Sequence, residues 1–525
     1  MKALLVSPKH PQTFWSFNSV LKMLGKKGLL PPLGLMTLAA LLPRDWSLTI
    51  CDLTVRDIAE EEWRQCDLVM ISGLVSQHTG MVEAVREAKR RGKTVVVGGP
   101  WAFHVPEIFL EAGADIVVRG EGEVVMPQVL RAIEEGASGV FIEADRMADM
   151  ETSPTPRYDL IDMDAYVDMP LQFSRGCPFQ CDFCDVTLML GRKVRTKSPE
   201  QIMRELQVLY DMGWRRAVFF VDDNLIGSVS KAKEMLGKLI PWMEARGYPF
   251  DFYTQASVNL AANDEVLELM TRAGFYRVFL GIETPDKESL ALVSKHQNVA
   301  VDLDEVCDKI NRAGLQIIAG CIIGFDNERP GADQRLVDFA QRNHIPEMFV
   351  TLLQASPGTE LFKRLQKENR LVDMTMNDNL GSQTALLNFI PTRPTSQIAE
   401  EFLRLYDVLY DPDTYLERCF AHFARMRPRS FQKAGTPLKF SEFRAVAITL
   451  IRQGVLDSSR WTFWKYLYRA WRTFPHRLPN FVASCITGEH YYRYRHTIRR
   501  EIESQLQGRG DCAGGAPCEA VGART

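Results

Sequence analysis

The sequence lacks the features of a membrane-spanning, secreted or polyanion-binding protein. No run of about 18 apolar residues occurs, so we expect no helix that crosses a membrane. The first residues, Met1–Pro8, read as a short strand and a turn, without the flanks of a signal peptide. The 63 basic and 66 acidic residues leave a net charge of −3, which argues against polyanion binding over the whole surface.

The sequence also has no paired-cysteine pattern that would predict a disulfide framework. Its 11 cysteines include isolated ones, such as Cys51 and Cys307, in apolar segments typical of buried thiols. This usage indicates a reducing compartment, so we predict a cytoplasmic protein. At 525 residues the chain is long enough for several domains with large cores.

One short loop does group three cysteines, Cys177, Cys181 and Cys184, in a C-x3-C-x2-C spacing. No fourth Cys or His lies nearby. A cubane iron–sulfur cluster with four thiolates is an electron carrier, whereas three thiolates leave one iron open to a chelating small molecule. Because zinc structural sites use four ligands in paired spacings, a zinc knuckle or a chance grouping is the less favoured interpretation.

The first part of the chain, residues 1–136, predicts a doubly wound, Rossmann-like domain. Continuous apolar strands alternate with helical segments there, which is typical of a parallel sheet. Ligands of such sheets bind at the carboxyl ends of the strands. The strand ends are rich in glycine, whose missing Cβ atoms would let a bulky ligand approach, and the candidate ligand-binding residues there are Ser72, Gly73, Leu74, Gly98, Gly99, Pro100, Gly120 and Glu121. Residues 137–168, which include the Pro-rich segment 153–157, read as a linker.

Residues 169–370 predict six β/α units. A closed barrel needs eight, so we expect an open, partial barrel with its polar residues at the carboxyl ends of the strands. The paired carboxylates Asp222 and Asp223 could also bind magnesium, a less favoured interpretation. Together the two modules define an α/β protein.

The cysteine loop, with Phe183 just before its last cysteine, resembles that of the radical S-adenosylmethionine (SAM) superfamily. There SAM chelates the open iron of a [4Fe–4S] cluster and is cleaved to a 5′-deoxyadenosyl radical. The resemblance implies that Cys177, Cys181 and Cys184 hold the cluster. It also implies a set of SAM-binding residues: Phe183, Asp222, Asp223, Asn224, Gln255, Glu283, Thr284 and Ile323.

The N-terminal module resembles the cobalamin-binding domain that precedes many radical SAM domains. Segments 71–75 and 97–100 are similar to its nucleotide-tail pocket. The family's D-x-H-x-x-G motif is absent, and the loop 7–15 offers His10 as a cobalt ligand without the flanking Asp and Gly. The resemblance implies cobalamin as a cofactor; the alternative is a doubly wound domain whose glycines only form turns.

The C-terminal region, residues 371–505, predicts a helical domain with two basic aromatic stretches, 460–472 and 490–496. We favour aromatics that pack on the barrel while the cations face solvent. A membrane-surface helix and a platform for single-stranded nucleic acid are the alternatives, the last least favoured. Residues 506–525 predict a disordered tail.

The strings at 220–226, 281–286 and 352–359 are similar to the branch that contains the hopanoid C-2 methylase. The resemblance implies a C-methyltransferase that moves methyl from SAM through methylcobalamin to an unactivated carbon of a lipid-like or other small molecule. It further implies a ferredoxin- or flavodoxin-like electron donor. Together with the basic aromatic stretch 460–472, it favours a membrane lipid as substrate and peripheral contact with the inner face of the membrane through the C-terminal region. Non-methylating ring formation or oxidation, and a non-catalytic cobalamin or iron–sulfur sensor, remain as alternatives.

Overall fold

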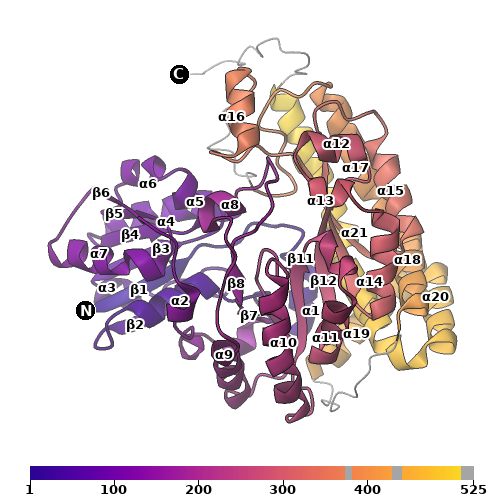
Figure 1. Cartoon of the computed structure of the whole chain (residues 1–525), viewed down its shortest axis with the longest axis horizontal. Coiled ribbons are helices and arrows are strands. Elements are labelled where there is room, and N and C mark those ends of the chain that lie inside the picture. The colour runs from indigo at the N-terminus through magenta and orange to yellow at the C-terminus, as the bar shows by residue number, and fades with distance from the viewer. Residues whose placement is uncertain (373–380, 428–439, 510–525) are drawn as a thin grey trace.

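The computed structural model describes residues 1–372, 381–427 and 440–509. Figure 1 shows an N-terminal α/β domain beside a second parallel sheet, with the C-terminal helices against the far side of that sheet. Among the described residues, no helix combines the length and apolar character needed to cross a membrane.

The N-terminal sheet has six parallel strands in the order β2-β1-β3-β4-β5-β6. The strands are β1 Lys2–Ser7, β2 Ser47–Asp52, β3 Leu68–Ser72, β4 Thr94–Gly98, β5 Ile116–Arg119 and β6 Val140–Glu143. Helices α2 (Leu33–Leu41) and α7 (Gly122–Glu134) pack on one face, while α3 (Glu60–Gln65), α4 (His78–Arg90), α5 (Pro100–His104) and α6 (Glu107–Glu111) pack on the other. The predicted doubly wound domain is confirmed.

The predicted domain boundary at residue 136 is wrong, because β6 pairs with β5 through residue 143. This strand is only four residues long and follows directly on a polar turn at Ser138 and Gly139. In the sequence, so short an apolar run does not distinguish a strand from a linker. The connection to the second sheet therefore begins after residue 143.

The second sheet also has six parallel strands, in the order β14-β13-β12-β11-β10-β7. The strands are β7 Met169–Leu171, β10 Ala217–Phe220, β11 Asp251–Ala256, β12 Phe275–Glu283, β13 Gln316–Ile323 and β14 Glu347–Leu352. The main crossover helices are α9 (Pro199–Asp211), α10 (Val229–Glu244), α11 (Asp264–Ala273), α14 (Leu303–Ala313) and α15 (Ala332–Arg342). Because each strand lies beside its neighbour in the chain, the sheet is the open six-unit barrel that the sequence predicts.

The inner face of this open barrel is aromatic and only partly buried. Along β10 and β11 the residues alternate: Phe220 and Phe252 are buried against the helices, whereas Phe219 and Tyr253 stay partly exposed on the other face. Phe219 and Tyr253 stack with ring centroids 4.5 Å apart. The inner face is therefore incompletely filled by the chain itself.

The segment after β1 inserts into the open side of the barrel, which the sequence did not predict. The Trp15 ring lies 5.3 Å from that of Phe349 in β14 and 6.0 Å from that of Phe279 in β12. The fully buried Phe14 stacks on Tyr491 at 4.6 Å. The N-terminal domain thus supplies part of the barrel's inner wall.

The C-terminal region is helical, as predicted. Its helices are α17 Thr395–Leu409, α18 Pro412–Arg425, α19 Phe440–Ile451, α20 Arg460–Thr473 and α21 Leu478–Arg509. α17 covers the edge of β14: the hydroxyl of Tyr406 donates to the carbonyl of Val350 at 2.8 Å, and that of Tyr410 to Met348 at 2.7 Å. Both hydroxyls also accept from the strand's amides, which satisfies an otherwise unpaired edge.

The predicted tail 506–525 is helical at its start, since α21 continues to Arg509. The remainder, 510–525, lies outside the described residues. The prediction that the aromatic stretches pack inward holds for segment 490–496, where Tyr491 and Tyr494 are buried. In segment 460–472, Phe463 and Tyr466 are buried, whereas Trp461 is 74% exposed.

One buried carboxylate ties α21 to the barrel. Glu347 in β14 is fully buried, pairs with Arg277 at 3.1 Å and accepts from the Tyr491 hydroxyl at 2.9 Å. We expect Tyr491→Phe to lower the free energy of unfolding by about 1.5–3 kcal/mol, because it removes a hydrogen bond to a charged group. Urea unfolding followed by circular dichroism measures this change.

The neighbouring Tyr492 is a matched control. Its hydroxyl is buried and has no hydrogen-bond partner among the described residues. Tyr492→Phe should therefore leave the unfolding midpoint unchanged or raise it. Equal loss of stability in both variants would contradict the assigned role of Tyr491.

Candidate active site

The three grouped cysteines lie in the connection of a short hairpin, just before a helix, at the carboxyl end of the barrel strands. The hairpin pairs β8 (Ser174–Arg175) with β9 (Arg195–Thr196), and α8 spans Val186–Leu190. Cys177, Cys181 and Cys184 are all partly exposed free thiols. Gly176 has φ +94°, and a Cβ there would lie 2.9 Å from two carbonyl oxygens, so glycine is required where the loop folds tightly on residues 190–193.

The loop fits an iron–sulfur cluster better than a single metal ion. Among the described residues, no group of three or more His, Cys, Asp and Glu is arranged to hold one ion. The charge of Cys181 nevertheless acts on both Cys177 and Cys184, so the three thiols share one small space. Burial raises the pKa of the Cys177 and Cys184 thiols, and three thiolates so placed require positive charge.

Lys295 supplies one positive charge at this site, a role that no motif in the sequence indicated. Its ammonium pairs with Glu283 at 2.6 Å and lies 5.9 Å from the centre of the Phe183 ring. Burial works to lower the pKa of Lys295, but the charges of Glu283 and Cys181 outweigh it and raise that pKa. Two residues on, the Gln297 amide donates to the Cys181 sulfur at 3.6 Å.

Two of the residues predicted to bind SAM are held by the protein. The fully buried Asp222 carboxylate accepts hydrogen bonds from the amides of Phe173 and Ser174 and from the Ser174 hydroxyl. The Asn224 side chain is bound to Ser257, and its Oδ1 accepts a hydrogen bond from the Ser257 backbone amide at 3.1 Å. Both side chains fix the ends of strands, and their contact with SAM stays a prediction.

Asp223 is different, since its Oδ2 is buried without a hydrogen-bond partner among the described residues. Burial, then the charges of Asp222 and Asp185, raises its pKa to about 7. Its charge acts on Cys177. A buried carboxylate oxygen without a partner beside the cysteine loop suits a cationic ligand group such as an ammonium.

The other predicted SAM residues gather at the same end of the barrel. Glu283 ends β12 with φ +62°, a conformation uncommon outside glycine, and Gln255 lies partly exposed on the inner face of β11. Thr284 is buried, and its hydroxyl accepts from the Asp286 amide at 3.2 Å. Ile323 is buried, and its carbonyl already accepts from Leu353 at 2.9 Å, so it offers packing only.

The predicted cobalamin residues other than His10 lie at one edge of the N-terminal sheet, at the carboxyl ends of β3, β4 and β5. Ser72, Gly98, Gly99 and Pro100 are partly exposed, and Leu74 is 52% exposed. A Cβ on Gly99 (φ +92°) would lie 2.5 Å from the Ser72 hydroxyl. This low edge of small residues, with an exposed leucine on it, fits a bulky ligand. His10 lies beside Thr54 at the end of β2, and burial lowers its pKa.

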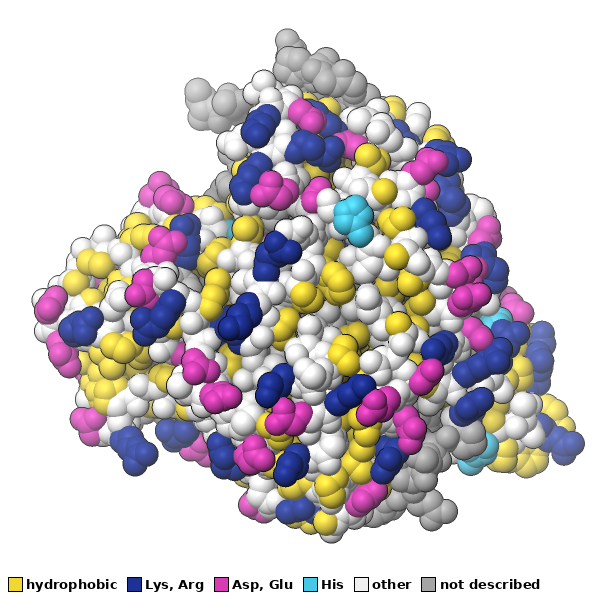
Figure 2. Space-filling view, viewed as in Figure 1, with side chains coloured by type: hydrophobic (Ala, Val, Ile, Leu, Met, Phe, Trp, Pro, Cys, Tyr) yellow, Lys and Arg dark blue, Asp and Glu magenta, His cyan; other side chains and the backbone are white. Residues whose placement is uncertain are grey.

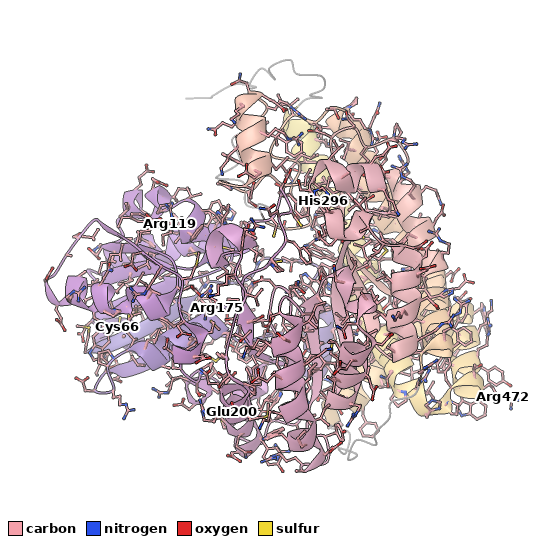
Figure 3. All side chains as sticks on the ribbon, viewed as in Figure 1. Cys66, Arg119, Arg175, Glu200, His296 and Arg472 are labelled. Atoms are coloured by element: carbon pink, nitrogen blue, oxygen red, sulfur yellow. The ribbon has the colours of Figure 1, made fainter. Side chains whose placement is uncertain are left out.

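The Glu121 carboxylate is paired with side chains of the second domain, and its place beside cobalamin stays a prediction. It pairs with Arg175 at 2.7 Å and Arg195 at 2.8 Å, and it accepts from the Ala148 amide at 2.7 Å. Glu123 pairs with Arg175 at 2.9 Å. The four charged side chains are at most 13% exposed. Figure 3 shows Arg175 where the two domains meet.

A second bridge joins the same two parts. His104, at the end of α5, lies with its Nε2 3.0 Å from a carboxylate oxygen of Asp185, the residue after Cys184. The edge of the N-terminal sheet and the cysteine loop therefore face each other across buried contacts. Trp15, which follows β1 of the N-terminal domain, contacts the inner barrel face at Phe279 and Phe349.

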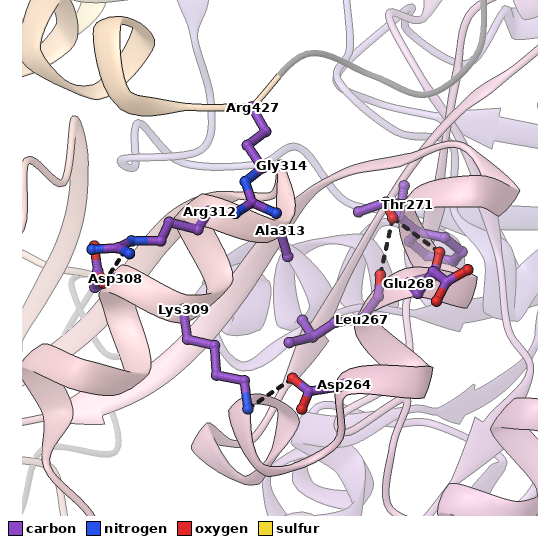
Figure 4. A pocket seen from close by; sticks show the side chains of 11 residues that line it. Asp264, Leu267, Glu268, Thr271, Asp308, Lys309, Arg312, Ala313, Gly314 and Arg427 are labelled. Atoms are coloured by element: carbon purple, nitrogen blue, oxygen red, sulfur yellow. Dashed lines mark hydrogen bonds and ion pairs between the residues drawn. The ribbon is translucent and has the colours of Figure 1, made fainter.

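A separate cavity of about 550 Å³ lies on the helical outside of the barrel, between α11 and α14 (Figure 4). Its charged residues pair with one another: Lys309 with Asp264 at 2.8 Å, and Arg312 with Asp308 at 2.8 Å. It also borders Phe275, at the start of β12. The cavity is thus at the opposite end of that strand from the cysteine loop.

The fold and site define a two-domain enzyme whose Rossmann-like domain presents a ligand edge to a cysteine loop on an open barrel. Residues 26–130 match the family model described as B12 binding domain, and residues 171–340 match Radical SAM superfamily. Residues 359–504 match a domain of unknown function, DUF4070.

Two curated relatives match nearly the whole chain. An uncharacterised methyltransferase of Synechocystis sp. (strain ATCC 27184 / PCC 6803 / Kazusa) is 45% identical, over 97% of this chain and 94% of the relative. The hopanoid C-2 methylase of Rhodopseudomonas palustris (strain TIE-1) is 30% identical, over 95% of this chain and 94% of the relative.

Among solved structures, the radical SAM methyltransferase TsrM of Kitasatospora setae, with cobalamin and a [4Fe–4S] cluster bound, is similar in fold. Its TM-score is 0.58 at 14% identity, over 95% of this chain and 99% of that one. The protein belongs to the cobalamin-dependent radical SAM methyltransferase family, whose cofactors are SAM, a [4Fe–4S] cluster and cobalamin.

The ion pairs between the domains can be tested with Glu121→Ala. Because the change leaves Arg175 and Arg195 buried with less opposing charge, we expect a loss of about 3–5 kcal/mol in stability. The iron bound after cluster reconstitution should fall as well, since Arg175 begins the cysteine loop. Thermal unfolding and iron analysis measure the two effects.

Glu143→Ala is the matched control, because Glu143 is 56% exposed and pairs with Arg119 at 3.4 Å. A surface pair of this kind contributes about 0–1 kcal/mol. If Glu121→Ala unfolds no earlier than Glu143→Ala, the buried ion pairs do not hold the domains together.

Proposed function

We propose that the protein is a C-methyltransferase that moves a methyl group from SAM, by way of cobalamin, to an unactivated carbon of a small, lipid-like molecule. The observation that carries the proposal is the buried bridge between the two domains, Glu121 with Arg175 and His104 with Asp185. It sets the two cofactor edges against each other beside one inner barrel face. Methyl transfer through a substrate radical needs that proximity.

When bound, the cluster and SAM supply a 5′-deoxyadenosyl radical, and cobalamin supplies the methyl group. Cys177, Cys181 and Cys184 would hold the cluster. The partnerless Asp223 oxygen would accept from the SAM ammonium, and Glu283 would accept from the ribose hydroxyls. Lys295, now paired with Glu283 at 2.6 Å, would bind the SAM carboxylate.

The remaining predicted residues would shape the same sites. Phe183, Gln255, Thr284 and Ile323 would line the adenosyl portion of SAM. Ser72, Gly73, Leu74, Gly98, Gly99, Pro100 and Gly120 would border cobalamin. His10, from the N-terminal loop, would be a ligand of the cobalt, which its partly buried place beside Thr54 supports.

The substrate class follows from the inner barrel face. Phe219, Tyr253, Phe279, Phe349 and Trp15 present partly exposed rings rather than charged groups. Such a wall favours a bulky apolar molecule. The name of the 30% identical relative, hopanoid C-2 methylase, supports a lipid-like substrate. We further propose a cytoplasmic protein that works at the inner face of the membrane, with a ferredoxin- or flavodoxin-like electron donor.

The reaction can be tested by mass spectrometry of the nucleoside products. Protein purified without oxygen and reconstituted with cluster is given SAM, a reductant and methylcobalamin. We expect 5′-deoxyadenosine together with S-adenosylhomocysteine, and loss of the deoxyadenosine in Cys181→Ala. Cys66→Ala, which changes a buried thiol in the N-terminal domain, should keep both products (Figure 3).

Two outcomes would contradict the proposal. Deoxyadenosine without S-adenosylhomocysteine, in the presence of a lipid extract that contains the substrate, would favour ring formation or oxidation. Neither product, with cluster and cobalamin both bound, would favour a sensor.

The role of Lys295 can be tested separately through SAM affinity. Lys295→Gln removes a charge-assisted hydrogen bond of about 1.5–3 kcal/mol, so the Kd for SAM should rise roughly 10- to 100-fold. Lys309→Gln, in the cavity on the helical side of the barrel, is the control and should not change the Kd. Equilibrium dialysis of the reconstituted protein measures both, and an unchanged Kd in Lys295→Gln would remove this residue from the site.

A further inference from the structure

Helix α20 carries an aromatic face that the described part of the chain leaves exposed. Trp461 is 74% exposed, Trp464 42%, Tyr468 60% and Trp471 53%. Their spacing of three, four and three residues places them on one side of the helix. The opposite side, with Phe463, Tyr466 and Ala470, is buried against the C-terminal region. We call the four exposed aromatic residues the outer face of α20.

The turn that leads into α20 extends this face. Val455 is 60% exposed, Leu456 73%, and Ile451, at the end of α19, 54%. Segment 452–456 is in contact with α20, so these side chains adjoin the outer face. A contiguous exposed surface of this kind is unusual for a side of a protein that meets only water.

The charge of the same helix has one sign. Arg460, Lys465, Arg469 and Arg472 are exposed, and α20 has no Asp or Glu. None of the four forms an ion pair with the described part of the chain. Figure 2 shows dark blue and yellow side chains together at the right-hand edge of the molecule, where Figure 1 draws α20 and Figure 3 labels Arg472.

Tryptophan and tyrosine beside unpaired basic residues match the chemistry of a membrane surface. Their rings prefer the region between lipid headgroups and acyl chains, where one side is apolar and the other polar. Arginine and lysine next to them pair with anionic headgroups. A nucleic acid also offers anions, but its bases would need an open groove. The outer face of α20 is convex, which disfavours a nucleic acid.

We propose that the outer face of α20 docks the protein on an anionic lipid bilayer. The helix lies in the plane of the surface, with its tryptophans among the headgroups and its cations over the phosphates. Through this surface the protein would reach the lipid-like substrate proposed above. Only this purpose of the docking rests on the proposed function. The docking itself needs neither SAM cleavage nor methyl transfer.

Vesicle flotation of the reconstituted full-length protein tests the docking. The vesicles contain phosphatidylcholine, alone or with 30% phosphatidylglycerol, roughly the anionic content that gives a cytoplasmic leaflet its negative potential. We expect flotation with the anionic vesicles, less with neutral ones, and release as salt rises. The double variant Trp461→Ser/Trp471→Ser should lower the partition coefficient roughly tenfold or more.

The control is Met212→Ser/Leu292→Ser, which removes two apolar side chains, 41% and 44% exposed, at the ends of two helices of the barrel domain. It should float as the unchanged protein does. Arg460→Gln/Lys465→Gln/Arg472→Gln should bind the anionic vesicles less tightly and with a weaker dependence on salt. Circular dichroism and iron content establish that each variant is folded and loaded.

Three results would overturn the proposal: no flotation with any vesicle, equal flotation of the tryptophan variant, or a lipid-free dimer in sedimentation velocity that this variant abolishes. The last result would assign the face to a second copy of the chain. Failure of the methyl-transfer assay would leave the flotation result unchanged, so the two proposals fail separately.

Discussion

The active site depends on four buried charges at the junction of the two domains. Glu121 and Glu123 come from the edge that follows β5, and Arg175 and Arg195 come from the hairpin that encloses the cysteine loop. Breaking such a pair leaves a buried charge without its partner, which costs several kcal/mol. Relative motion of the domains is therefore opposed where the edge of the N-terminal sheet meets the cysteine loop. The contact between His104 and Asp185 opposes motion at the same junction.

The ion pairs between the domains explain how the cysteine loop can be partly exposed while its backbone stays fixed. Its start is held by Arg175, its end by Asp185, and its middle by the amide of Asp182 on the carbonyl of Val293 at 3.1 Å. The loop keeps partly exposed thiols and a nearby ammonium, Lys295, while its backbone is fixed at three points. A site of this kind is organised before its ligand binds, so less free energy is spent on ordering it.

The sequence predicted the features that are local in the chain. The cysteine spacing, the strands of both sheets and the residues at their carboxyl ends follow from short-range patterns, and the structure brings those residues to one side of each sheet. The pattern could not distinguish Asp222 from Asp223. Adjacent carboxylates look alike in sequence, yet one is saturated by the amides after β7 and the other is left with a partnerless oxygen.

What the sequence could not supply is long-range. Glu121 was predicted to border a ligand because it follows a strand, but its partners are 54 and 74 residues away in the chain. Lys295 lies in a polar segment after a helix, and no periodicity or motif in that segment predicts that it lies near the cysteines. The insertion of Phe14 and Trp15 into the barrel depends on rings contributed by β12, β14 and α21. No window of sequence contains such contacts.

The C-terminal region, which matches only a domain of unknown function, gains a physical role from the same contacts. α17 closes the edge of β14 with two tyrosine hydroxyls. α21 holds the inserted N-terminal loop, since His490 donates to the Phe14 carbonyl at 2.9 Å and Tyr491 anchors to Glu347. Burial lowers the pKa of His490 to about 4, so this bond is made by a neutral ring at neutral pH. The region that braces the barrel and its inserted loop is thus the one that carries α20, which packs on both α18 and α21.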